Sequence, residues 1–393
     1  MSSAPDQALA PAAQLDASGR SFVAFARWAS ALVVVMLSHL RGVMLIGWGD
    51  LPPGLHNPLV AGFYFATSFY HEAVFVFFVL SGFLIAGPNL DRVRILSFSP
   101  KSYAIDRFTR IYVTAFPALL LTIAADALGR HFLPGAGYYD GTNLLLTDRV
   151  VGGVQGDSFL GFIRNVFMLQ PAHAPMLGSN VPLWSLSYEV WFYVWFGVCA
   201  FALQAKRRSA TLWIALASIG LLLFHWTAIF YVAIWCFGAL AYQRSRWPRS
   251  IILALIAVVL SLILSRADFV AGSIPGIPLK WSDLPLGLAF AWTLALMKRR
   301  SYRIWNGTEQ FNQALSNFSY SLYVIHYPLL LCFVSLYATL GHVAQIKQGL
   351  LPNAIGLAIY LLVAVSTFLS AFIFSRIFEA RTGAARRWLK ARV

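Results

Sequence analysis

The fold is decided by residues 25–42, FARWASALVVVMLSHLRG. This stretch is an apolar run with an arginine, Arg27, near its first turn and a histidine, His39, near its last. An ionisable side chain inside a membrane helix is unfavourable unless it faces a partner or a cavity, so each is a candidate functional group. At helical rise, about 18 Å separates Arg27 from His39, more than half the hydrocarbon thickness. One helix would therefore carry a cation near one face and a titratable base toward the other.

The composition indicates a membrane protein. The 393 residues are 59% hydrophobic and only 11% charged, whereas about 25% of a soluble domain is charged. The net charge of +15 sits in short clusters between apolar runs, which is typical of membrane topology and argues against nucleic acid as a partner. The cysteines Cys199, Cys236 and Cys332 lie inside apolar runs, and no His/Cys/Asp cluster has ligand spacing, so no metal site is predicted.

Apolar windows predict an all-α membrane protein, a bundle of about ten transmembrane helices. The windows are 24–46, 70–88, 111–129, 183–203, 210–225, 228–242, 250–265, 283–297, 319–340 and 352–377. Of the 30 lysines and arginines, 23 fall on one side of this arrangement and 7 on the other. Because positive charge favours the cytoplasmic side, we expect both termini in the cytoplasm. The division is a disordered cytoplasmic tail at 1–20, a transmembrane domain at 21–380 and a basic cytoplasmic tail at 381–393.

In this topology the longest connection, 130–182, lies outside the cytoplasm, and its length is typical of a functional cover or binding loop. The polar groups in or near the spans then take definite places. His39 lies in the outer half of the first span, Glu189 two turns into the fourth from outside, and Ser81 deep in the second. Three further sets are His71 and Glu72 at the outer face, Tyr320 and His326 in the inner half of the ninth span, and Arg107 and Arg110 at the cytoplasmic mouth of the third.

Five pieces in this order resemble the acyltransferase-3 family of integral-membrane O-acyltransferases. They are the Arg…His pair of the first span, FFVLSGFLI, the RxxR of Arg107 and Arg110, PLWSLSYE and SYSLYVIHYP, spread from residue 27 to residue 328. The resemblance implies a bacterial inner-membrane enzyme that modifies polysaccharides. It would move an acyl group, most often acetyl, from cytoplasmic acyl-coenzyme A to a hydroxyl of an extracytoplasmic glycan or glycolipid.

The first span departs from the family pattern in one respect. The family has ten residues between the arginine and the histidine, and this chain has eleven. Ten residues put the two side chains about 20° apart around a helix, whereas eleven put them about 120° apart. Either a π-bulge restores the shared face, or Arg27 is not the equivalent arginine.

The chemistry of acyl transfer fits these residues. A sugar hydroxyl needs a base, for which His39 is the candidate, and Glu189 at similar depth would orient the imidazole. An anionic donor needs guanidinium groups for its phosphates, as Arg107 and Arg110 offer on one helical face. With these, Arg27, Tyr320, His326 and Ser81 are assigned to donor binding, and His71, Glu72 and Trp184 to acceptor binding.

Each assignment has a structural rival. His39, Glu189, Tyr320 and His326 can simply hydrogen-bond across helices, and Arg107 and Arg110 can be positive-inside anchors. For Ser81, close helix packing beside Gly82 is favoured over a chemical role. Two other functions also stay open. A transporter or flippase of a lipid-linked or anionic substrate would use the His and Glu groups as proton relays, but no inverted repeat is found. A structural partner in polysaccharide export leaves the buried charges unexplained.

Overall fold

The structure is a computed structural model that describes residues 15–146, 158–170, 173–205, 209–224, 228–244, 246–271, 280–341 and 343–392. Within these ranges the secondary structure is helical throughout, apart from an isolated parallel bridge between Leu45 and Leu350. The all-α prediction is therefore confirmed. Of the predicted N-terminal tail, residues 1–14 lie outside the described residues, and the first helix already begins at Ala17.

Each of the ten predicted windows falls on a helical segment, and among the described residues five segments are long and apolar enough to cross a membrane. These five are Pro58–Arg94, Pro100–Phe132, Val181–Gln204, Ser319–Leu340 and Ala354–Arg392. Shorter apolar helices cover Ala210–Leu221, Ala228–Gln243 and Ile251–Arg266. The ten-span count and the cytoplasmic position of the termini stay predictions.

Backbone contacts divide the chain into two compact units. The first unit takes Met1–Trp28, Val74–Pro100 and Phe192–Ser316, and the second takes Ala29–Ala73, Lys101–Trp191 and Asn317–Val393. Three helices contribute residues to both units: α1 (Ala17–Ala31), α4 (Tyr70–Ser81) and α8 (Trp184–Gln204).

The first unit is a set of helices around α10. Its remaining elements are η5 (Gly82–Ala86), α5 (Gly87–Arg94), α9 (Ala210–Phe224), α10 (Ala228–Gln243), α11 (Ile251–Ala271), α12 (Asp283–Arg299), η9 (Arg303–Trp305) and α13 (Glu309–Ser316). Helix α10 packs on η5, α5 and α12, and α11 and α12 lie side by side.

Two glycines allow α10 and the π-helical segment η5 to meet backbone to backbone. A Cβ added to Gly82 would lie 1.8 Å from the carbonyl oxygen of Trp235, and one added to Gly238 would lie 1.9 Å from that of Val79. No side chain fits at either position. Small residues serve the same purpose at many membrane helix contacts, because lipid gives no hydrophobic force to press helices together.

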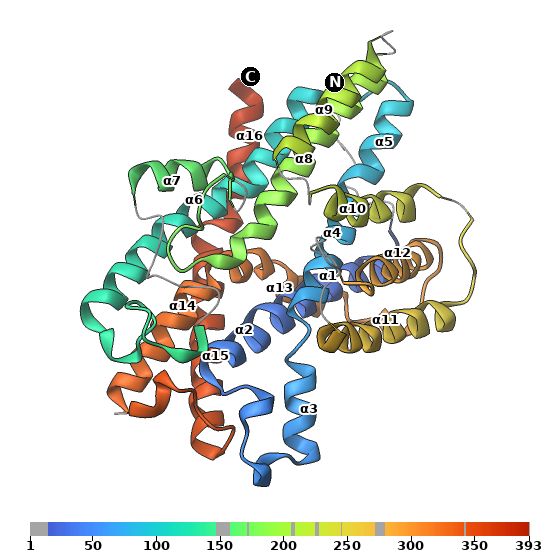
Figure 1. Cartoon of the computed structure of the whole chain (residues 1–393). Coiled ribbons are helices and arrows are strands. Elements are labelled where there is room, and N and C mark those ends of the chain that lie inside the picture. Colours follow the sequence, from blue (N-terminus) through green and yellow to red (C-terminus); the bar gives the residue numbers. More distant parts are fainter. Residues whose placement is uncertain are drawn as a thin grey trace. The chain divides into compact units, whose positions relative to one another are not determined.

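The second unit holds the remaining elements, with α14 at its centre. They are η2 (Leu32–Ser38), α2 (His39–Met44), η3 (Trp48–Asp50), η4 (Pro53–Leu55), α3 (Pro58–Ala66), α6 (Pro100–Phe132), η6 (Pro134–Ala136), η7 (Leu144–Leu146), α7 (Phe159–Val166), η8 (Val181–Leu183), α14 (Ser319–Leu340), η10 (Ala344–Lys347), α15 (Ala354–Ile377), η11 (Glu379–Arg381) and α16 (Thr382–Arg392). Helices α14 and α15 run side by side (Figure 1), and η2 and α2 also pack on α14.

The C-terminal segment predicted as a basic tail is helical over most of its length. Within α16, Arg386 and Lys390 are four residues apart and so share one helical face. Both reach the Asp106 carboxylate on α6, at 3.4 Å and 2.9 Å. These contacts tie α16 to the N-terminal part of α6.

Candidate active site

The helix that carries His39 changes its winding directly before that residue. Between α1 and α2, Leu32–Ser38 is π-helical, and His39 is the first residue of α2. A π-helical segment accommodates additional residues within a helix. The sequence offered a π-bulge as one of two explanations for the extra residue between Arg27 and His39, and a π-helical segment lies between them. The Tyr360 hydroxyl on α15 donates to the Leu37 carbonyl of this segment at 2.8 Å.

A second histidine is hydrogen-bonded to His39. Nδ1 of His39 lies 2.9 Å from Nε2 of this second residue, His326 on α14. The two rings are almost parallel, with 5° between their planes and 5.1 Å between their centres. His326 is fully buried. The predicted topology places these residues in opposite halves of the membrane, and this prediction is wrong, because two hydrogen-bonded side chains must lie at one depth.

The protons of this pair follow from its hydrogen bonds. His326 Nδ1 lies 2.7 Å from the carbonyl oxygen of Tyr323, and a carbonyl only accepts, so Nδ1 carries the proton. In neutral His326 the other nitrogen, Nε2, is then an acceptor, and His39 Nδ1 must donate to it. The proton of neutral His39 is thus fixed on Nδ1, which leaves a lone pair on its Nε2. A histidine held in one tautomer through its other nitrogen is the arrangement that a general base needs.

Aromatic rings surround the His39 imidazole. The ring of Tyr327 meets it edge-on with centres 5.4 Å apart, and that of Tyr70 lies 5.6 Å away at a tilt of 43°. These rings limit the rotation of His39.

The turn of α14 that carries His326 is held by the segment leading into α8. The Tyr323 hydroxyl donates to the Pro182 carbonyl at 2.6 Å and also hydrogen-bonds the Ser185 hydroxyl. Asn180 donates to the Val324 carbonyl at 2.9 Å. These residues are not among the predicted site residues.

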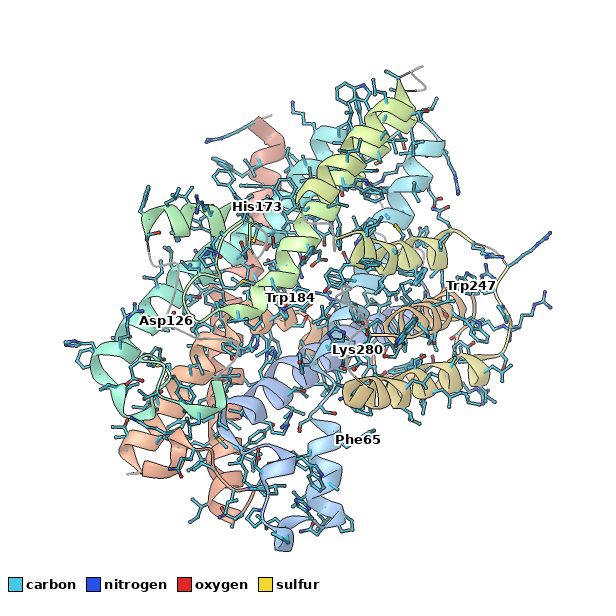
Figure 2. All side chains as sticks on the ribbon, viewed as in Figure 1. Phe65, Asp126, His173, Trp184, Trp247 and Lys280 are labelled. Atoms are coloured by element: carbon cyan, nitrogen blue, oxygen red, sulfur yellow. The ribbon has the colours of Figure 1, made fainter. Side chains whose placement is uncertain are left out.

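Asp126 on α6 anchors the same segment. Its buried carboxylate accepts from the Ser179 amide at 2.8 Å and from the Ser179 hydroxyl at 2.6 Å. Figure 2 labels Asp126 on α6 and Trp184 at the start of α8. Asn180 also donates to Thr122 on α6 at 2.9 Å, so α6 and α14 both hold residues 179–185.

Glu189 lies within electrostatic range of Tyr320 and Tyr323 on α14. It therefore lies near the stretch of α14 just before His326. Glu189 is the residue predicted to orient the His39 imidazole, and in the structure the residue hydrogen-bonded to His39 Nδ1 is His326. A catalytic role for Glu189 stays a prediction.

The predicted donor arginines lie on α6, and one of them is paired with an acid. Arg110 contacts Glu379 of η11 at 2.8 Å and lies over the ring of Tyr320, 4.9 Å from its centre. Glu379 in turn accepts from the Ser321 amide and hydroxyl at 3.0 Å and 2.7 Å. Tyr320 and His326 are six residues apart, so Arg110 lies about 9 Å along α14 from the histidine pair. Arg107 is partly exposed, one turn earlier on α6.

The other predicted site residues lie in various settings. Ser81 hydrogen-bonds Tyr193 at 3.0 Å and Trp235 at 3.1 Å within the first unit, which also contains Arg27. In the second unit Glu72 is buried, whereas His71 and Trp184 are partly buried. Trp184 packs against Tyr188 with ring centres 5.9 Å apart. The donor and acceptor roles of these residues stay predictions.

Comparison with known proteins identifies the family. The family model described as an acyltransferase domain, of the acyltransferase-3 type, matches residues 21–376. An uncharacterized protein of Haemophilus influenzae is 29% identical over 134 residues, which is 34% of this chain and 50% of that protein. The chain thus matches half the length of this relative, and no solved structure matches the chain. With a family match over most of its length and several apolar helices, the chain belongs to the acyltransferase-3 family as a multi-pass membrane protein.

Proposed function

We propose that the protein is an O-acyltransferase that uses cytoplasmic acyl-coenzyme A, with acetyl as the expected acyl group. The acceptor is a hydroxyl of a glycan or glycolipid outside the cytoplasm, and the membrane is the bacterial inner membrane. The observation that carries the proposal is the relay from His39 through His326 to the Tyr323 carbonyl. It leaves Nε2 of His39 as a base inside an acyltransferase domain.

In the proposed mechanism the acyl group is transferred directly from donor to acceptor. His39 Nε2 takes the proton of the acceptor hydroxyl while the hydroxyl oxygen attacks the thioester carbonyl carbon. The new C–O bond forms, the C–S bond breaks, and the imidazolium returns its proton to the departing thiolate. While His39 is charged, its Nδ1–H donates to His326 Nε2, and this hydrogen bond strengthens with the charge. A general base of this kind contributes about 10²–10⁴-fold to the rate.

The donor side rests on Arg107 and Arg110 of α6. Their guanidinium groups offer planar, forked donors that suit the phosphates of coenzyme A. Arg110 is stacked on Tyr320 of the same helix that carries His326. The thin pantetheine arm would then extend along α14 from Arg110 toward His39. The Glu379 carboxylate that pairs with Arg110 sets the orientation of this guanidinium before the donor arrives.

Oriented membrane vesicles test the proposal. We expect acyl-coenzyme A to be used only from the cytoplasmic face, free coenzyme A to return there, and the acyl group to be found on an acceptor supplied outside. A matched preparation with His39→Ala should bind the donor but transfer little. Passage of intact coenzyme A or intact acceptor across the membrane, without acyl product, would instead establish the transporter alternative.

A further inference from the structure

Arg41 lies two residues after His39 on α2 and is partly buried. Its Nε donates to the Thr67 carbonyl at 3.4 Å, which is a long hydrogen bond. Its guanidinium lies over the ring of Tyr64, 5.1 Å from the ring centre. Among the residues that the structure describes, no acidic side chain pairs with Arg41, and its two terminal amino groups have no hydrogen-bond partner.

Three tyrosines lie near the Arg41 guanidinium. Tyr64, Tyr360 and Tyr70 lie within electrostatic range of Arg41. The hydroxyl protons of two of them are already used, since Tyr64 donates to the Ile46 carbonyl at 2.7 Å and Tyr360 to the Leu37 carbonyl. The ring face of Tyr64 attracts the cation but does not neutralise its charge. A partly desolvated arginine with free donors therefore suits a ligand that brings a negative charge.

The same rings connect Arg41 to the proposed base and to the surface. Tyr70, which lies within range of Arg41, also contacts the His39 ring. In the other direction, Tyr64 contacts Trp48 with ring centres 5.6 Å apart. Trp48 is 40% exposed and stacks on His56 at 4.8 Å. An aromatic face of this kind can carry the apolar face of a sugar ring.

We propose that Arg41 and Trp48 form a subsite for an oxyanion on the acceptor, so that this enzyme acylates an acidic glycan or glycolipid. The oxyanion is a carboxylate of an acidic sugar or a phosphate of a lipid-linked one. Arg41 takes the oxyanion through its terminal amino groups, and the neighbouring sugar stacks on Trp48. The acceptor hydroxyl then comes within reach of His39 past Tyr70. The inference rests on the proposed function, because it assumes that His39 serves acyl transfer.

A binding measurement without acyl-coenzyme A tests this subsite independently of catalysis. The purified protein in neutral detergent is titrated with three probes: an oligogalacturonide, its fully methyl-esterified form and a polyprenyl phosphate. We expect one of the two anionic probes to bind and the neutral ester to bind at least tenfold more weakly. The anionic probe that binds identifies carboxylate or phosphate as the ligand.

Variants assign the binding to Arg41. Arg41→Gln should weaken the anionic probe about 10- to 100-fold, the loss expected for a charge-assisted hydrogen bond. Arg41→Lys keeps the positive charge without the forked donors of a guanidinium, and its affinity for the anionic probe should lie between those of wild type and Arg41→Gln. Arg164→Gln, which changes an exposed arginine on α7, should bind as the wild type does. Melting curves show which variants are folded. If Arg41→Gln does not fold, Arg41→Lys and Trp48→Leu provide the test.

The proposal is overturned if neither anionic probe binds, if the ester binds equally well, or if folded Arg41 variants keep wild-type affinity. Acyl transfer from acyl-coenzyme A together with such a result would retain the proposed function and remove only the subsite. Anion binding at Arg41 without any acyl transfer would retain the subsite and contradict the proposed function.

Discussion

Replacing His326 probes the relay that fixes the proton of His39. In His326→Ala the acceptor at 2.9 Å from His39 Nδ1 is lost, so His39 is free to place its proton on Nε2. A neutral hydrogen bond contributes about 1 kcal/mol and one to a charged group about 1.5–3 kcal/mol. The bond is stronger once His39 is protonated, and only this difference of about 0.5–2 kcal/mol acts on kcat, which should fall about two- to thirty-fold. Because Tyr70 and Tyr327 still limit the rotation of His39, this loss should be smaller than that of His39→Ala.

His326→Gln is the matched rescue variant. A glutamine amide oxygen can reach the position of His326 Nε2 and accept from His39 Nδ1–H. We therefore expect His326→Gln to retain more activity than His326→Ala at equal folded concentration. Since His326 is fully buried, its truncation also leaves a cavity, and each kcat is measured below the melting temperature of the variant.

The assay is the release of free coenzyme A coupled to acceptor acylation, with kcat and KM determined separately for donor and acceptor. The relay predicts a change in kcat with little change in either KM. A kcat of His326→Ala equal to that of wild type would show that His326 does not support the charged form of His39. A loss in both His326 variants as deep as in His39→Ala would make His326 itself the base.

Three further predictions concern the donor arginines, a helix contact within the first unit and the segment that leads into α8. Arg110→Ala should weaken acyl-coenzyme A binding in a thermal-shift titration and also lower stability by about 1–3 kcal/mol, because it leaves the buried Glu379 carboxylate without its cation. Adding Glu379→Gln to Arg110→Ala should restore the stability but not the donor affinity. Arg107→Ala should lower the donor affinity alone. Equal melting temperatures of Arg110→Ala and wild type would contradict a stabilising role of the Arg110–Glu379 pair. Gly238→Ala should destabilise the protein by about 1–3 kcal/mol or more through the clash with the Val79 carbonyl. The control Gly220→Ala has open space around its Cβ and should not lower stability in this way. Similar melting temperatures of the two variants would contradict the close contact. Asp126→Ala should speed hydrogen exchange at the Ser179 amide by about 5- to 150-fold, since it removes a bond worth about 1–3 kcal/mol; unchanged exchange would show that Asp126 does not hold this segment.

The helices could be predicted from the sequence because an apolar run long enough to span lipid has few other ways to pair its backbone. The ninth window, 319–340, coincides with α14. The tenth, 352–377, differs from α15 by two residues at its start. The π-helical segment also had a signal, namely the one-residue excess between Arg27 and His39.

The pairing of His39 with His326 could not be predicted in this way. The predicted depth in the membrane rests on the ends of apolar windows, but α1 begins at Ala17, seven residues before its window. Apolar windows report composition and not the ends of helices, so the relative depth of two helices is lost. Which face α14 turns toward α2 depends on packing between residues far apart in the chain. The ion pair between Arg110 and Glu379 also has no local signal in the sequence, because Glu379 lies after the end of the tenth window.

In the proposed mechanism His39 is the base of an acyl transfer across the membrane. The most direct test of this role is the acyl transfer rate of His39→Ala against wild type in oriented vesicles, with labelled acetyl-coenzyme A inside the cytoplasmic compartment and acceptor outside. We predict a loss of about 10²–10⁴-fold in kcat with donor affinity and melting temperature close to those of wild type. Transfer by His39→Ala within a few-fold of wild type would contradict the account.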